Sequence, residues 1–323
     1  MLRPVEDSDR GNLRTISYSQ ASLKKQCDFR YKLKYIDGNH SDSKTLPLEL
    51  GSILHKGLEL KAREVMCGSV VSYEYIHDCV VAGCQEKTDK GTEKLRGIED
   101  LAADYFAEWY TPDNASGMDY DEKMSIYFDK VLPTRMEDNL WSVVGAEVSF
   151  EFVYKDRCII HGFIDRIDRS KANPAVYRIT DYKSSKKIFP ESDIKTPLQM
   201  VIYDMACHFL YGVVPEEHVY DFILLDQMQG PKDGVCTKGY LKRGLKQLDK
   251  ILDSIDDCIT TGLYKPSPSP LCYWCDFADA GHTPNASERL GGMCPYYSLW
   301  TPAERTFKVN QPWDELTYMM NYT

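Results

Sequence analysis

The chain of 323 residues carries 49 acidic and 39 basic side chains, for a net charge of −10, and 43% of its residues are hydrophobic. These values are ordinary for a folded protein that buries a full core. No basic stretch followed by an apolar one opens the chain and no apolar run could span a bilayer, so we expect a cytoplasmic protein without a membrane segment. Eleven cysteines, an odd number, argue against a disulfide framework there and leave metal binding or burial.

Charge is distributed unevenly along the chain. The segment from Arg10 to Tyr35 holds seven basic residues against one acid, Asp28, whereas acids concentrate between Glu86 and Asp138. An acidic chain with local basic segments is compatible with a protein that binds phosphate groups, and equally compatible with an unrelated enzyme. Composition therefore does not decide between these classes.

A first helix is predicted over residues 17–36. Ser17 and Gln20 have the spacing of a capping box, and Asp37-Gly38 provides a helix end. Cys27 lies on the apolar stripe of this helix. A single cysteine in such a place is usually a buried small hydrophobic residue.

A second helix is predicted to begin at Gly51, after a polar loop. His55 and Glu59 are four residues apart and share one face of it. A lone histidine near a helix start is more often structural than a metal ligand. Residues 61–135 show mostly helical patterns, interrupted at 111–117, and carry no chemical motif.

The stretch from Ala146 to Tyr154 is predicted as a strand because apolar and polar residues alternate along it. Glu147 falls on the polar side, beside Ser149 and Glu151. It either faces solvent or supports a site on that face.

Two strands joined by a turn are predicted between His161 and Lys183. The turn chemistry lies at Lys171-Ala-Asn-Pro174. Residues two apart on a strand share a face, so Asp181 and Lys183 project together, and Asp165 on the preceding strand can lie beside them. Converging carboxylates repel one another unless a cation lies between them. With a lysine close by, this is the outline of a metal-dependent hydrolase site.

A helix is predicted over Leu198–Tyr211, with Thr196-Pro197 as its N-terminal cap. Gln199 and Tyr203 are polar exceptions on this apolar helix and share a face. A further strand is predicted over Tyr220–Leu225.

The C-terminal part begins with an amphipathic helix over Leu241–Ile259, whose apolar residues alternate at spacings of three and four. A Pro/Ser linker at residues 265–270 leads to a C-x-x-C motif formed by Cys272 and Cys275. A third cysteine, Cys294, follows later in the sequence. A short tail helix near Trp313 has no assigned role.

The order of these parts resembles the RecB-like branch of the PD-(D/E)xK nuclease superfamily, including CRISPR-associated and phage-encoded exonucleases with an iron–sulfur cluster. The elements that carry the resemblance, between Ser17 and Tyr297, are a helix with a cysteine, G-x-x-x-H, G-F-I-D-R-I-D, D-Y-K, Q-x-x-x-Y and a late cysteine cluster. The D-x-K motif alone has little weight, and the order of several elements has much more.

The resemblance implies a role for each matching residue. Asp165 and Asp181 would bind Mg²⁺ or Mn²⁺, which agrees with the preference of these hard cations for oxygen ligands, and His55 would be a further ligand. Lys183 would orient the attacking water. The residues with supporting roles at the site would be Glu147, Gln199 and Tyr203. Asp168, in contrast, is expected in a salt bridge or turn.

The resemblance also implies a four-thiolate site formed by Cys27, Cys272, Cys275 and Cys294. We expect a [4Fe–4S] cluster there, with Zn²⁺ as the alternative, because thiolates suit both. The 18 residues between Cys275 and Cys294 are more than this family usually has, and His282 in between is a substitute ligand that would favour zinc.

The expected fold is an α/β (α+β) restriction-endonuclease-like core, with a mixed sheet between helices. The expected segments are N-terminal helices (14–60), a helical insertion (61–140), the nuclease core (141–262), a cysteine-rich metal-binding segment (263–300) and a tail (301–323). The expected function is that of a metal-dependent DNA exonuclease or end-processing enzyme acting on free or single-stranded ends in recombination, repair or phage DNA metabolism. Two alternatives are a DNA-end-binding scaffold with little activity and an endonuclease. The basic residues expected to contact DNA are Lys24, Lys25, Arg30, Lys186 and Lys187.

Overall fold

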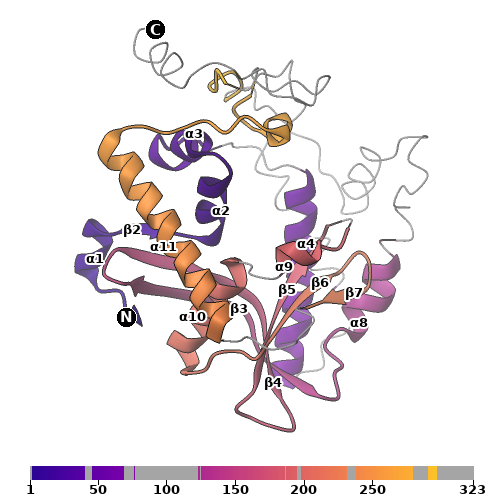
Figure 1. Ribbon diagram of the computed structural model, residues 1–323. Coiled ribbons are helices and arrows are strands. Elements are labelled where there is room, and N and C mark those ends of the chain that lie inside the picture. The colour runs from indigo at the N-terminus through magenta and orange to yellow at the C-terminus, as the bar shows by residue number, and fades with distance from the viewer. Residues whose placement is uncertain are drawn as a thin grey trace, which may run out of the picture. The chain divides into compact units, whose positions relative to one another are not determined.

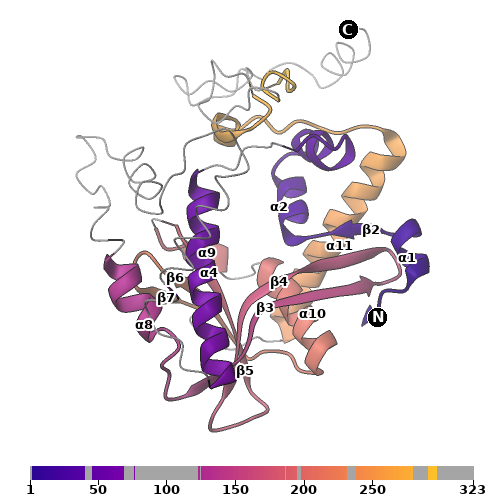
Figure 2. The ribbon, with the colours of Figure 1, turned by 180° about the vertical axis from the view of Figure 1, so that it is seen from behind.

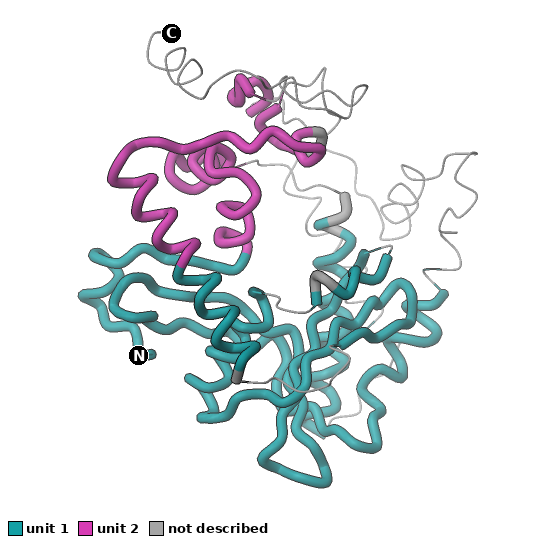
Figure 3. Tube along the Cα trace, in the orientation of Figure 1, with its two compact units in different colours: residues 1–18, 45–249 teal, residues 19–44, 250–323 magenta. Residues whose placement is uncertain are grey.

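The computed structural model describes residues 2–40, 46–68, 76, 123, 125–185, 187–194, 198–230, 238–278 and 290–296 (Figure 1). The chain forms two compact units (Figure 3). Unit 1 comprises residues 1–18 and 45–249, and unit 2 comprises residues 19–44 and 250–323. Most of the insertion predicted at 61–140, the cap at Thr196-Pro197, the tail and His282 lie outside the described residues.

Unit 1 is built on a mixed seven-stranded sheet with the order β1-β3-β4-β5-β6-β7, and β2 pairs with β4 off this path. The β3–β4 and β4–β5 pairs are antiparallel, whereas β5–β6 and β2–β4 are parallel. The strands are β1 (Leu2–Arg3), β2 (Arg14–Ile16), β3 (Trp141–Tyr154), β4 (Cys158–Ser170), β5 (Tyr177–Lys183), β6 (Glu217–Phe222) and β7 (Gln227–Gln229).

The two central predicted strands and their turn are confirmed as β4 and β5. The Asn173 side chain accepts a hydrogen bond from the Ala175 N–H at 3.1 Å, which closes the turn. The strand predicted from Ala146 is also confirmed, but it begins earlier, at Trp141, with a β-bulge between Val143 and Gly145. A bulge inserts an extra residue, and the regular alternation therefore fails on its N-terminal side.

Helices cover both faces of this sheet. Those of unit 1 are α1 (Asp7–Asn12), α4 (Leu46–Cys67), η2 (Ile126–Val131), α8 (Leu132–Thr134), α9 (Glu191–Ile194) and α10 (Leu198–Tyr211). Figures 1 and 2 show α4 and α10 on opposite sides of the sheet. Buried residues of α4, among them Leu54 and Leu58, form one core with Ala146 and Tyr182, and Phe209 of α10 packs on Phe152. The restriction-endonuclease-like class is thereby confirmed.

The start predicted for the second helix is wrong. Helix α4 begins at Leu46, and Gly51 lies inside it. Proline is tolerated in a first helical turn because its missing N–H would be unpaired there, so Pro47 does not end the helix.

The single helix predicted over residues 17–36 is also wrong, because it is interrupted at Cys27. Helix α2 (Tyr18–Gln26) ends there, α3 (Asp28–Tyr31) begins, and a π-helical turn, η1 (Lys32–Ile36), follows. Cys27 has φ −160° and ψ 115°, and its sulfur accepts the Arg30 N–H at 3.4 Å, so it caps α3. The predicted end at Asp37-Gly38 is confirmed by φ +73° at Gly38, a conformation that favours glycine.

Unit 2 combines residues 19–36 with the later part of α11 (Lys238–Thr261), which begins in unit 1, and with a 3₁₀ turn, η3 (Pro270–Trp274). The Lys24 side chain is buried in unit 2, where it pairs with Asp28 and donates to Ser254 Oγ at 2.7 Å. Among the described residues, no helix is long and apolar enough to cross a membrane.

Candidate metal centre and cysteine pocket

Three side chains from three elements of unit 1 bring their ligand atoms together. His55 of α4, Glu147 of β3 and Asp165 of β4 each offer one ligand atom, and these atoms all lie within 4.8 Å of one another. Nδ1 of His55 lies 3.6 Å from Oδ2 of Asp165. One nitrogen and two carboxylate oxygens are ligands that a divalent cation can share.

Gly51 explains how His55 reaches the sheet. A Cβ atom at Gly51 would lie 2.9 Å from Ser184 Oγ, closer than real Cβ atoms approach a neighbour. The missing side chain therefore lets α4 lie against the chain just after Lys183, and His55 follows one helical turn later. The His55 ring packs edge-on against Tyr182, with 5.7 Å between ring centroids. This contact gives a physical reason for the G-x-x-x-H spacing.

Glu147 reaches the site through an unusual backbone conformation. Its φ is +46°, in the left-handed region that a residue with a Cβ rarely adopts. The register on either side, Ala146 with Arg166 and Val148 with Ile164, brings Glu147 opposite Asp165. Its carboxylate lies with those of the metal centre.

Asp165 lies where β4 and β5 separate. The paired register between these strands runs from Arg169–Tyr177 to Arg166–Thr180 and stops there. The Tyr182 N–H then donates to Asp165 Oδ2 at 2.7 Å, in place of a strand partner. Because the two strands diverge here, the Tyr182 N–H has no main-chain partner in β4 and can hydrogen-bond the Asp165 carboxylate.

Asp181 and Lys183 project from one face of β5, as predicted, and form an ion pair. Asp181 is buried, at 1% exposure. Gln199 of α10 connects the group, since its amide N–H₂ donates to Asp181 Oδ1 at 2.8 Å and to the Tyr203 hydroxyl at 2.9 Å, while its oxygen accepts from Lys183 Nζ at 3.2 Å. Tyr203 also donates to Asp181, at 3.4 Å. Gln199 therefore holds both the carboxylate and the lysine, and Tyr203 holds the carboxylate.

Burial makes negative charge costly at this centre. It raises the pKa of Asp165 well above its usual range, with a further rise from Asp181, against the Tyr182 N–H that lowers it. Burial also raises the pKa of Asp181 and of Glu147. It lowers the pKa of His55 to about 4, assisted by the Lys183 charge. A bound cation would offset the mutual repulsion of the carboxylates and leave His55 neutral, as a metal ligand must be.

Lys183 stays cationic beside this cluster. Burial lowers its pKa, but the charge of Asp181 and the hydrogen bond to it raise the pKa by more. Its ammonium nitrogen also lies 5.7 Å from the ring centroid of Tyr220. The G-x-x-x-H motif pointed to Gly51, whereas sequence patterns do not reveal the contributions of the Tyr182 N–H and of Tyr220.

Asp168 belongs to a different, structural group, as expected. It is fully buried and forms ion pairs with Arg166 at 2.7 Å and with Arg178 at 2.9 Å. Both arginines lie within the sheet, so Asp168 has no free oxygen pair for a metal.

A family comparison agrees with this geometry. A model of the PD-(D/E)XK nuclease superfamily matches residues 15–280. The chain belongs to this superfamily. The match includes all seven residues predicted for the nuclease centre, and the family is one of metal-dependent nucleases that act on nucleic acid. No curated protein matches the chain.

The basic residues expected to contact DNA in this nuclease are placed differently from one another. Lys24 is not placed to contact DNA, because its ammonium group is buried and pairs with Asp28. The Arg30 side chain is 20% exposed and lies 3.6 Å from Asp276. Lys25 and Lys187 are exposed, and Lys186 lies outside the described residues.

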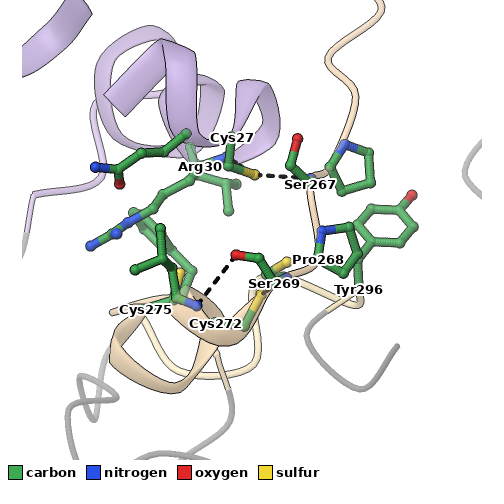
Figure 4. Close-up of a pocket in the computed structure, with 14 residues that line it drawn as sticks. Cys27, Arg30, Ser267, Pro268, Ser269, Cys272, Cys275 and Tyr296 are labelled. Carbon is green, nitrogen blue, oxygen red and sulfur yellow. Dashed lines mark hydrogen bonds between the residues drawn. The ribbon is translucent and has the colours of Figure 1, made fainter. Parts of the chain in front are cut away.

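The four cysteines singled out by the resemblance line one pocket of unit 2 (Figure 4). We call it the cysteine pocket; it is lined by Cys27, Cys272, Cys275 and Cys294. Arg30 and Tyr296 also line it. The segment after α11 thus returns to the start of α3, in the same unit.

Two sulfurs in the cysteine pocket accept hydrogen bonds from main-chain N–H groups. Cys27 accepts from Arg30 and Ser267, both at 3.4 Å, and Cys272 accepts from Ser269 at 3.4 Å. The main-chain N–H groups of Phe277 and Tyr296 lower the pKa of Cys275 and of Cys294, respectively. Burial raises the pKa of Cys272 and Cys275, and that of Cys294 to about 12. The thiols of the pocket are therefore partly shielded from water and lie near main-chain N–H groups.

Proposed function

We propose that the protein is a Mg²⁺- or Mn²⁺-dependent deoxyribonuclease of the RecB-like branch, an exonuclease or end-processing enzyme. The observation that carries this proposal is the meeting of His55, Glu147 and Asp165 ligand atoms within 4.8 Å, beside the Asp181–Lys183 pair. The substrate would be DNA with a free or single-stranded end, in recombination, repair or phage DNA metabolism.

The metal ligands would be His55, Glu147, Asp165 and Asp181. A divalent cation bound there lowers the pKa of water and shields the charge of the phosphate. Lys183 is a compact cation whose position is fixed by Asp181 and Gln199. It is suited to hold a water in line and to stabilise charge that develops on the phosphate. Tyr203 and Gln199 keep Asp181 oriented.

A comparison of labelled linear single-stranded, linear double-stranded and circular DNA tests this function. We expect cleavage of linear substrates with Mg²⁺ or Mn²⁺, none with EDTA, and a loss of at least about 100-fold for Asp165→Asn and Lys183→Met. Glu137→Gln, an exposed acid of unit 1, is the matched control. Cleavage of circles at the rate of linear DNA would overturn the end-processing part, and equal activity of the variants would overturn the catalytic assignment.

Metal binding is checked without reference to activity. Calorimetric titration with Mn²⁺ should show binding by the wild type and the Glu137→Gln control, and weaker binding by Asp165→Asn. Binding without cleavage of any substrate would support the DNA-end-binding alternative instead.

We also propose that the cysteine pocket holds a [4Fe–4S] cluster. The main-chain N–H donors to Cys27 and Cys272 are the kind of environment that stabilises thiolates bound to a cluster. Thiolates bind Zn²⁺ as well, so a zinc ion is the alternative occupant.

Metal analysis of the purified protein separates the two occupants. We expect iron and inorganic sulfide with visible absorbance, lost in Cys272→Ser and kept in Cys258→Ser, which alters a buried cysteine of unit 2 outside the pocket. A colourless wild type with stoichiometric zinc would replace the cluster by a zinc site.

A further inference from the structure

Phe163 is an exposed aromatic residue on a strand whose other apolar residues are buried. It is 56% exposed, whereas Ile160, Ile164 and Ile167 of β4 are fully buried. It lies two residues before Asp165, so both side chains leave β4 on the same side. A single exposed apolar residue is ordinary; the place of this ring, next to the metal centre, is what separates it from other exposed positions.

The backbone beneath the ring is locked in place. A Cβ atom at Gly162 would lie 2.8 Å from Cζ of Phe150, so β4 rests directly on the Phe150 ring at this point. Gly162 and Ile164 leave the strand on the side opposite to Phe163, whose ring stays 56% exposed. Its ring is held at the surface by the strand itself.

Phe163 belongs to a row of cross-strand pairs that leads away from the metal centre. Glu147 lies opposite Asp165, between the pairs Ala146–Arg166 and Val148–Ile164; Ser149 and Phe163 form the next pair on this face, and Glu151 and His161 the third. Successive pairs are about 6.6 Å apart, from a rise of about 3.3 Å per residue. The acid of the third pair is neutralised, because Arg10 donates two hydrogen bonds to Glu151, at 2.9 and 2.6 Å.

We propose that Phe163 is a positioning residue that stacks on the nucleobase next to the scissile phosphate, and that the substrate is unpaired at that nucleotide. This inference rests on the proposed function, because it takes the metal centre as the place of the phosphate. A base with both faces free can lie on an aromatic ring, whereas a base within a duplex is stacked on its neighbours. Ser149, opposite the ring, adds a hydroxyl that can hydrogen-bond the sugar–phosphate backbone.

A double-mutant cycle tests the stacking, with a substitution of Phe163 as one change and an abasic site in the oligonucleotide as the other. Single-stranded oligonucleotides with an abasic site at each successive position are cleaved by wild type, Phe163→Ala and Phe163→Trp. Stacking on one base should contribute about 5- to 150-fold. We expect Phe163→Ala to raise the KM for the strand without an abasic site by about 5- to 150-fold. Phe163→Trp, which keeps an aromatic ring, should have a KM close to that of the wild type.

The abasic site at one position should weaken the wild type by a similar factor and leave Phe163→Ala unaffected, because the partner is already absent. A merely structural role of the ring would weaken all substrates alike. Leu140→Ala, which removes another exposed apolar side chain of unit 1 (68% exposed), is the control and should behave as wild type. Independent, additive losses at every abasic position would overturn the inference.

Measuring Kd instead of KM for the same proteins and oligonucleotides tests the stacking separately from the nuclease proposal. Fluorescence anisotropy of the labelled strands in Ca²⁺ needs no cleavage. If the wild type cleaves nothing, the proposed function fails, and the same abasic-dependent difference in Kd would still support stacking. Equal Kd values for wild type and Phe163→Ala would overturn it.

Discussion

The left-handed conformation of Glu147 predicts that removing its Cβ stabilises the metal-free protein. A residue with a Cβ in this region costs roughly 1–2 kcal/mol, whereas glycine adopts it without that cost. The relevant comparison is Glu147→Ala with Glu147→Gly, because neither variant has a carboxylate and they differ only in the Cβ. Ser149, two residues along the same strand and exposed, supplies the reference pair Ser149→Ala and Ser149→Gly.

The two positions should respond with opposite sign. In an ordinary strand, alanine to glycine destabilises by roughly 0.5–1 kcal/mol through backbone entropy. At position 147 the relief of about 1–2 kcal/mol outweighs that entropy, so Glu147→Gly should be about 0.5–1 kcal/mol more stable than Glu147→Ala. The difference between the two positions is then about 1–2 kcal/mol, which equals the strain itself.

Urea unfolding in EDTA, followed by circular dichroism, measures this difference. The slope of free energy against urea should be the same for all four variants, so that midpoints compare directly. The reasoning is refuted if glycine costs as much at position 147 as at position 149. Both Glu147 variants should bind Mn²⁺ equally weakly, because the backbone strain serves only to aim the carboxylate.

Three further outcomes follow from the geometry. Gly162→Ala should destabilise by about 1–3 kcal/mol in urea unfolding, because its Cβ would press on the Phe150 ring; an unchanged midpoint would contradict that contact. Burial raises the pKa of Asp221 to about 6, so its protonated form stabilises the fold, and this contribution is lost as pH rises from about 4 to 6. The wild-type unfolding free energy minus that of Asp221→Asn should therefore fall over this range by on the order of 2–3 kcal/mol, and a flat difference would exclude the shift. Tyr203→Phe removes a donor to Asp181 and should lower kcat/KM about 10-fold, a result to be checked by steady-state cleavage.

The residues of the metal centre that sequence patterns predict are those whose signal is local. Asp165, Asp181 and Lys183 interrupt apolar strands with charge, and the period of two assigns them to faces without any knowledge of the tertiary structure. Gln199 and Tyr203 stand out for the same reason on an apolar helix.

The features that sequence patterns miss depend on contacts made elsewhere. The i, i+4 spacing around Cys27 continues across the helix break, which is stabilised by the N–H of Ser267, 240 residues later. Lys24 was expected to contact DNA, but its side chain is buried beside Ser254, which lies 230 residues later in the sequence. The alternation around Glu147 assigns it a face correctly, yet nothing in the pattern reveals its left-handed backbone.

The discontinuity of unit 2 has a consequence for biosynthesis. Its first segment, residues 19–44, leaves the ribosome early, whereas Cys294 follows Cys27 by 267 positions. At about 5–20 residues per second, the first cysteine waits about 13–53 s for the last. Unit 1 can complete its fold during that interval, and the four thiols meet only afterwards. Insertion of the metal group into the cysteine pocket would then be the last step in the maturation of this chain. The complete set of four thiols could not bind the metal group before Cys294 has been synthesised.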